Sequence, residues 1–192
     1  MAGTTHFADA LHERMQEVSS QVVVGLDPRV NRLPQPILDD VVDRHGHSPR
    51  AAAEAISEFN RRVLAAVHEN VAAVKCQVAF YEKWGVEGMK AYARTIRCAH
   101  DRGIPVIGDV KRNDIGSTAG AYADGHLGGK REGMWRPSGD FVTDAVTVNP
   151  YFGSDGVEPF LERASENGRG AFALVRTTNP SAGELQEMAD KD

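Results

Sequence analysis

Five short apolar runs, each separated from the next by a longer amphipathic or polar segment, constrain the fold of this chain more than any other feature. They begin near Val22, Ala72, Pro105, Ala145 and Ala171. Continuous apolar runs are typical of parallel strands buried on both faces, and connections of a dozen or more residues have room for a covering helix. The sequence therefore predicts an α/β fold with a parallel sheet of about five strands.

Helix signals lie between these runs. Leu11, Met15 and Val18 recur at helical spacing ahead of the first run. Ser48 followed by Pro49 is typical of a helix N-terminus, with serine as the cap and proline in the first helical position. The alternation of strand and helix is therefore β-α-β-α.

Two segments do not fit short connections: Pro34–Ser48 and Asp124–Asp140. The second is glycine-rich and polar, so we expect a surface excursion or a lid, with Trp135 available to anchor it. The chain shows no internal repeat and no linker. We expect a single domain over residues 1–192.

Composition narrows the class of partner. The chain is 41% hydrophobic and 26% charged, which suits a globular domain, and it has a net charge of -5 with scattered Lys and Arg residues. This pattern argues against nucleic acid and anionic membranes, and no apolar run reaches the roughly 18 residues of a membrane span. Cys76 and Cys98 are too few for a disulfide framework. We expect a cytoplasmic protein with a small-molecule partner.

Polar residues follow each apolar run, at the end of the strand where (β/α) barrels and open α/β sheets keep their active sites. They are Asp27, Lys75, Asp109 with Lys111, Asn149, and Thr177 with Thr178.

The third run ends in the largest group of charged residues. Asp109 and Lys111 are two apart, so their side chains project to the same face of a strand, and Asp114 lies in the turn that follows. An ammonium between two carboxylates stays protonated, which makes Lys111 a proton donor rather than a Schiff-base nucleophile. With Lys75, the result is a Lys-Asp-Lys-Asp array suited to an anionic substrate that loses charge. The alternative, a surface ion-pair cluster, is disfavoured by the position after an apolar strand.

The segment DVKRNDI at Asp109–Ile115, with Thr118 after it, resembles the DxKxxDIxxT signature of the orotidine 5'-phosphate decarboxylase family. VVVGLDP, VKCQVAFYE, VTVNPYFG and LVRTTNPSA resemble the other strand ends of the longer bacterial branch, in the same order. The likeness runs from Gln21 to about Met188. DxKxxD alone occurs in other phosphate-handling barrels, whereas five matching strand ends are specific.

This resemblance implies a (β/α)8 barrel that converts orotidine 5'-monophosphate to uridine 5'-monophosphate and CO2, with no metal or organic cofactor. It also implies a homodimer with active sites at the subunit interface. Lys111 would protonate C6 of the pyrimidine and Asp109 would face the departing carboxylate. Lys75 and Asp114 would complete the charged network.

The resemblance also implies substrate-binding residues. Asp27 would hold ribose hydroxyls, and Thr177 or Thr178 would lie at the pyrimidine edge. Ile115 would belong to the substrate-binding set, and Thr118, with Asp114, would reach the neighbouring subunit's site.

The chain departs from the family in length. A complete barrel of this kind has about 250 residues and eight strands, so we expect a C-terminally incomplete barrel with only about the first five βα units. The phosphate-binding residues are expected beyond Asp192. Such a chain in isolation is expected to be unstable or to aggregate, because open strand edges and apolar surface promote association.

Two alternatives remain. One is a Mg-dependent sugar-phosphate decarboxylase or synthase of the same barrel superfamily, which needs a carboxylate near the end of the second strand. Lys75 stands there instead and would repel magnesium. The other is an inactive truncated barrel.

Overall fold

The computed structural model of the chain describes residues 6–187, so both ends of the predicted domain, Met188 included, lie outside the described residues. Five parallel strands form one sheet in the order β1-β2-β3-β4-β5. Each begins within one residue of its predicted start, which confirms the predicted sheet. The strands are β1 (Val23–Leu26), β2 (Ala73–Gln77), β3 (Val106–Arg112), β4 (Ala145–Val148) and β5 (Gly170–Ala173).

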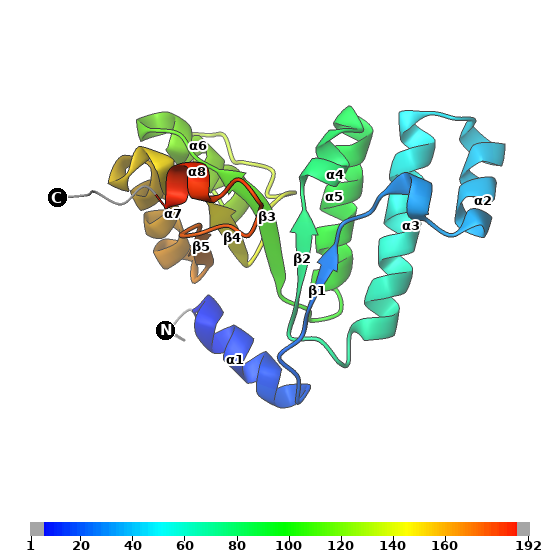
Figure 1. Ribbon diagram of the computed structural model, residues 1–192, viewed down its shortest axis with the longest axis horizontal. Coiled ribbons are helices and arrows are strands. Elements are labelled where there is room, and N and C mark those ends of the chain that lie inside the picture. The colour runs from blue at the N-terminus through cyan, green and yellow to red at the C-terminus, as the bar shows by residue number, and fades with distance from the viewer. Residues whose placement is uncertain (1–5, 188–192) are drawn as a thin grey trace.

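Helical segments connect these strands (Figure 1). The α-helices are α1 (Phe7–Glu17), α2 (Gln35–His45), α3 (Pro49–Val67), α4 (Ala79–Glu82), α5 (Gly85–His100), α6 (Gly116–Leu127), α7 (Ser154–Asn167) and α8 (Gly183–Gln186), and the 3-10 helices are η1 (Val30–Arg32) and η2 (Pro150–Phe152).

The strand order identifies the architecture. An open doubly wound sheet reverses its strand order at a switch point, whereas consecutive right-handed crossovers without a reversal put the helices on one side and curve the sheet into a barrel wall. The order here never reverses. The described residues therefore form five successive βα units of a (β/α) barrel, the predicted fold class.

The predicted start of α3 is confirmed. Ser48 Oγ accepts a hydrogen bond from the Ala51 N–H at 3.1 Å, and Pro49 occupies the first helical position. A cap of this kind contributes about 1 kcal/mol to helix stability. Ile56 and Leu64 of α3 are buried in the main core. The helix thus begins at the end of the barrel where the strands finish.

The two long connections contain more helix than the sequence indicated, and the expectation for the second was wrong in part. Residues 34–48 are mostly α2, because Ile37 and Val41 lie four apart and are both buried. The excursion at 124–140 begins later than expected, since residues 124–127 complete α6. Trp135 does not anchor it: its side chain is 80% exposed, at a tight turn where its backbone pairs with Glu132.

The two faces of the sheet have different surroundings. Val74, Cys76 and Val106 face the helices and lie in the main core. Cys76 is fully buried, and burial raises the pKa of its thiol to about 12. Within residues 6–187, no helix is long and apolar enough to cross a bilayer.

On the opposite face of the sheet, Phe7 of α1 packs with Ala73, Ile107 and Ala145, with the partly buried Leu11 beside them. These three strand residues lie near the strand starts, and Figure 1 shows α1 at that end of the sheet. The inner face is therefore apolar where the strands begin, which leaves its other end for polar side chains.

Both outermost strands have one neighbour each among the described residues. Val23 of β1 and Phe172 of β5 are exposed. These edges are consistent with the expected tendency to associate, which stays a prediction to be checked by the melting behaviour and light scattering of the purified chain.

Candidate active site

Asp109 lies at the centre of a charged cluster on the inner face of the sheet. Its Oδ2 accepts hydrogen bonds from Lys75 Nζ at 2.8 Å and Gln77 Nε2 at 2.9 Å. Its Oδ1 accepts a hydrogen bond from Thr147 Oγ1 at 2.9 Å and is ion-paired with Lys111 Nζ. The structure thus brings together the predicted residues Lys75, Asp109 and Lys111.

Strand geometry explains the grouping. Side chains two apart on a strand share a face, and Gln77 of β2 is in register with Asp109 of β3. Lys75 and Lys111 therefore flank Asp109 from two strands. The Asp109 side chain is 8% exposed, whereas those of Lys75 and Lys111 are 36% and 45% exposed. The carboxylate is enclosed and the ammonium groups remain accessible.

The charge balance of the cluster favours an anionic ligand. Burial raises the pKa of Asp109, but the hydrogen bonds from Lys111, Lys75 and Thr147 together outweigh it, so this pKa lies below its ordinary value. Asp109 is therefore anionic at neutral pH. Within the cluster itself, two ammonium groups face one carboxylate, so its three charged side chains carry a net positive charge.

Asp114 does not join the cluster within this chain. Its Oδ1 accepts the Ile115 N–H at 2.8 Å, and within residues 6–187 it has no ion pair with a lysine. Thr118 is exposed in the first turns of α6, and Ile115 is 55% exposed. The array found in one chain is Lys-Asp-Lys, and the expected fourth member, with the reach of Asp114 and Thr118 into a second subunit, stays a prediction.

Asp27 lies beside the cluster in register. Leu26, the last residue of β1, pairs with Cys76, so the position that follows β1 is level with Gln77 and hence with Asp109. The Asp27 side chain is exposed. Its position suits contact with a ligand over the cluster.

Thr177 and Thr178 follow β5. Thr177 Oγ1 accepts a hydrogen bond from Gln186 Nε2 of α8 at 2.9 Å, and Thr178 is exposed. Neither forms a hydrogen bond with the cluster in the described part of the chain.

Two residues of the cluster, Gln77 and Thr147, were not among the predicted site residues. Both lie on the inner face by the two-residue period, Gln77 two positions after Lys75 and Thr147 two positions after Ala145. The two-residue period, applied to every position of each strand, predicts both residues on the inner face, whereas the last polar residue of each strand does not.

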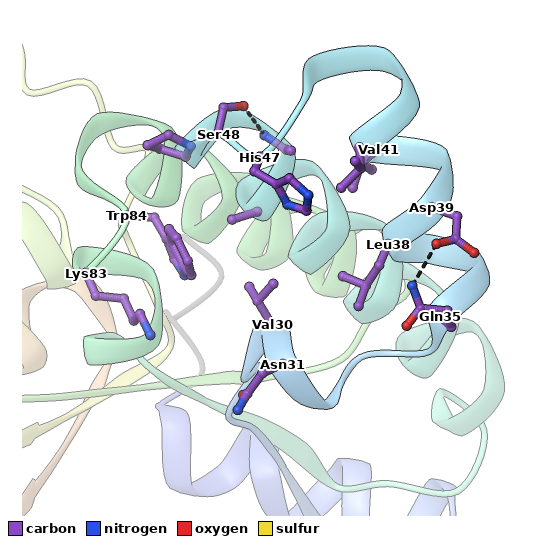
Figure 2. A pocket seen from close by; sticks show the side chains of 14 residues that line it. Val30, Asn31, Gln35, Leu38, Asp39, Val41, His47, Ser48, Lys83 and Trp84 are labelled. Atoms are coloured by element: carbon purple, nitrogen blue, oxygen red, sulfur yellow. Dashed lines mark hydrogen bonds between the residues drawn. The ribbon is translucent and has the colours of Figure 1, made fainter.

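A separate cleft of about 800 Å³ lies between η1, α2, the start of α3 and the residues after α4. Figure 2 shows Trp84 and Lys83 on one side, Leu38 on the other and Val30 below. None of the predicted site residues lines it. The cleft is thus distinct from the Asp109 cluster, which lies on the open inner face of the sheet.

In the part of the chain that the structure describes, no three His, Cys, Asp or Glu side chains gather as a possible metal site.

Successive βα units with a Lys-Asp-Lys cluster on the inner face define a barrel protein of the class that places its chemistry at the carboxyl ends of the strands. The family model described as "Orotidine 5'-phosphate decarboxylase / HUMPS family" matches residues 20–192. The chain belongs to the orotidine 5'-phosphate decarboxylase family.

Curated relatives agree. The chain is 42% identical over 183 residues to "Orotidine 5'-phosphate decarboxylase" of Rhodopirellula baltica, a match that covers 95% of the chain and 58% of that protein. It is 41% identical over 183 residues to the protein of the same name from Haloarcula marismortui, covering 95% of the chain and 57% of the relative. The chain therefore spans little more than half the length of these relatives.

Solved structures show the same fold. The OMP decarboxylase of Leishmania donovani is 31% identical with a TM-score of 0.72, covering 98% of the chain and 60% of that structure. The orotidine 5'-monophosphate decarboxylase of Plasmodium berghei reaches a TM-score of 0.78 at 20% identity, covering 97% of the chain and 66% of that structure. At that identity the second likeness concerns the fold alone.

Proposed function

We propose that the Lys75–Asp109–Lys111 cluster decarboxylates orotidine 5'-monophosphate to uridine 5'-monophosphate in pyrimidine biosynthesis, without a metal or organic cofactor. The bond between C6 and the carboxylate carbon breaks, CO2 leaves, and the electron pair stays on C6. Lys111 Nζ then delivers a proton to C6. The observation that carries the proposal is the Asp109 carboxylate held between two accessible ammonium groups.

The rate enhancement comes from charges that are already in place. Groups fixed by the fold stabilise charge that develops in the transition state without having to reorganise. The ammonium groups of Lys75 and Lys111 would lie near the carbanion at C6, and Asp109 would face the departing carboxylate. Protein hydrogen bonds hold all three charges before any substrate arrives.

The remaining residues have proposed binding roles. Asp27 holds ribose hydroxyls, and Ile115, Thr118 and either Thr177 or Thr178 contact the substrate. The exposure of Asp27 and Ile115 supports these roles.

A homodimer with shared active sites is part of the proposal. Asp114 and Thr118 would act in the neighbouring subunit's site. The lack of an ion pair between Asp114 and the lysines of its own chain, within residues 6–187, supports this arrangement. Sedimentation of the active protein would test the dimer. Mixing Asp114→Ala subunits with Lys111→Ala subunits would test the shared site, because each heterodimer would contain one site with both residues intact and would regain activity there.

We also propose that the protein is cytoplasmic and forms a single domain. Both cysteines are free, Cys76 in the core and Cys98 partly buried, which supports a reducing compartment.

The magnesium-dependent sugar-phosphate alternative is less consistent with the site. The Lys75 ammonium lies 2.8 Å from Asp109 Oδ2, where it would compete with a divalent cation for that carboxylate. Activity that disappears in EDTA would favour this alternative.

The test is the loss of orotidine 5'-monophosphate absorbance in EDTA, measured for the 192-residue chain and for the longest reading frame that contains it. We expect metal-independent turnover in the longer form at least. Lack of turnover in both forms, with the proteins folded, would contradict the proposed function. Turnover in the 192-residue chain would refute the expectation that this chain alone is an incomplete enzyme.

A further inference from the structure

The ladder between β3 and β4 is interrupted at the proposed proton donor. Gly108 pairs with Val146 and Arg112 pairs with Val148, so the three residues Asp109–Lys111 lie opposite Thr147 alone. An irregularity of this kind is a β-bulge, which bends the strand and redirects its side chains. The bulged residues cannot all find backbone partners on β4.

Lys111 has an unusual backbone conformation within this bulge. Its φ is 45°, in the left-handed region where an L side chain crowds its own backbone. The Lys111 N–H donates to Thr147 Oγ1 at 3.0 Å instead of to a β4 carbonyl. The Thr147 hydroxyl therefore takes the place of the backbone carbonyl that would accept this N–H in a regular sheet.

The same hydroxyl reaches the charged cluster. Thr147 Oγ1 donates to Asp109 Oδ1 at 2.9 Å, and that oxygen is ion-paired with Lys111 Nζ. A threonine hydroxyl has one hydrogen and two lone pairs, so it can donate to Asp109 while accepting from the Lys111 N–H. The contacts form a closed ring in which Lys111 is held at both its backbone and its ammonium group.

Backbone contacts on both sides of the bulge are independent of Thr147. The Asp109 carbonyl accepts the Val78 N–H at 3.3 Å, and the Arg112 carbonyl accepts the Asn149 N–H at 3.0 Å. The Arg112 guanidinium also pairs with Glu82. Loss of the Thr147 hydroxyl would therefore leave the flanks in place and release Lys111 itself.

We infer that Thr147 is a positioning residue, which fixes the strained backbone of Lys111 and the Asp109 carboxylate in the one arrangement that aims the Lys111 ammonium at the reacting carbon. This inference rests on the proposed decarboxylation. It assigns Thr147 no contact with substrate, so its loss should reduce turnover and leave substrate binding largely intact.

The test compares Thr147→Val, which keeps the shape and removes the hydroxyl, with Thr147→Ser, which keeps the hydroxyl. Both are made in whichever form of the unmodified protein decarboxylates orotidine 5'-monophosphate. We expect kcat to fall about 30-fold or more in Thr147→Val with KM within about threefold, because small misplacements of a reacting group can cost about 100-fold. Thr147→Ser should recover most of the loss.

The pH profile gives a second readout. The hydroxyl is one of the hydrogen bonds that lower the pKa of Asp109, so the acidic limb of kcat should move to higher pH in Thr147→Val and stay in place in Thr147→Ser. Thr143→Val is the matched control, because it removes another buried threonine hydroxyl, one that donates to the Ala145 carbonyl at 3.0 Å. It should lower stability without moving the pH profile.

The outcomes separate the two proposals. An unmodified protein without decarboxylase activity refutes the proposed function. In that case, amide hydrogen exchange of the Lys111 N–H tests the role of Thr147. Protection that is lost in Thr147→Val and kept in Thr147→Ser supports the inference. An active protein whose Thr147→Val variant keeps kcat and its pH profile overturns the inference, as does an equal effect of Thr143→Val. Thr147→Ala replaces the valine variant if valine prevents folding.

Discussion

The two ends of the parallel strands each contain an aspartate between two basic side chains, yet the partners of the two aspartates differ. Asp109 lies toward the carboxyl end of β3. Asp144 directly precedes β4, at the opposite end, where its Oδ2 is 2.9 Å from His100 Nε2 and its Oδ1 pairs with Arg169. Asp144 Oδ2 also accepts the Val106 N–H at 2.8 Å.

The two carboxylates differ in the groups that they bind. Asp144 connects the end of α5, the first residue of β3 and the residue before β5, so its contacts join separate elements of the fold. Among the described residues, the Asp109 carboxylate accepts hydrogen bonds only from side chains, and its two lysines remain accessible. A similar set of charges thus connects elements of the fold at one end and forms the proposed reactive site at the other, the end where (β/α) barrels keep their active sites.

Replacing Lys111 should give the largest effect. Lys111→Ala removes both the proposed proton donor and a fixed positive charge, so we expect kcat to fall by at least about 10³-fold. The free energy of unfolding should change by less than about 1 kcal/mol, because the ammonium is partly exposed. Steady-state kinetics and urea unfolding measure the two quantities. Lys130→Ala, which removes an exposed pair with Glu166, is the control, and near-normal turnover in Lys111→Ala would remove the mechanism.

We expect acid to lower the stability of the fold by protonating His126. This residue lies in the last turn of α6, and its backbone carbonyl accepts the N–H of Thr143, which precedes β4. Burial, and to a smaller extent the Arg112 guanidinium, lowers the pKa of His126 to about 4 from 6.5. Between these values the unfolded chain binds more protons than the folded one, so stability is full above about pH 6.5 and falls as the pH drops toward 4, by up to about 3 kcal/mol.

Urea unfolding at several pH values, with His126→Gln, tests this dependence. The variant should lose much of the slope between pH 6.5 and 4. The exposed His12→Gln serves as the control and should keep it. An unchanged slope in His126→Gln would assign the acid sensitivity to carboxylates such as Asp144 instead.

Substitution of the two aspartates tests the comparison directly. Asp144→Asn leaves two basic side chains without their anion, and we expect it to lower the free energy of unfolding by about 2–3 kcal/mol with kcat per folded molecule unchanged. Asp109→Asn should abolish most turnover and change stability by less than about 1 kcal/mol, because water can solvate the accessible ammonium groups of Lys75 and Lys111 and no backbone N–H loses its acceptor. Equal stability losses in the two variants would show that both ends serve the fold alike.

Asp27→Ala should have the smallest effect. Asp27 is level with the cluster but forms no ion pair with it in the described part of the chain, so its proposed role is binding alone. We expect KM to rise about 10-fold, the usual cost of one or two hydrogen bonds to a charged group, with kcat within about threefold. A fall in kcat with KM unchanged would place Asp27 in the chemical step.

Most of the fold could be predicted from the sequence because apolar runs and helix signals are local. The five strands lie where those runs indicate, and Ser48 caps α3 as its position before Pro49 suggests. Helix α2 was missed because its buried face consists of little more than Ile37 and Val41 in a charged segment.

The site was only partly predictable because its geometry depends on an irregularity between strands. The two-residue period places Asp109 and Lys111 on one face, and this grouping is present. The bulge that sets Thr147 against both residues leaves no mark in the sequence, since Lys111 stands where a positive φ would have suggested glycine. The separation of Asp114 from its own lysines likewise depends on how the chain turns into α6.

The packing of α1 has a consequence for the order of events during synthesis. Phe7 contacts Ala73, Ile107 and Ala145, and its ring lies edge-on to that of Phe172, with 6.0 Å between ring centroids. Phe7 is translated before every strand of the sheet, whereas its aromatic partner Phe172 follows only after β4 has been made. The Phe7 side chain therefore stays exposed until the strands that it contacts have been translated. The complete docking of α1 requires that β2 to β5 have already assembled.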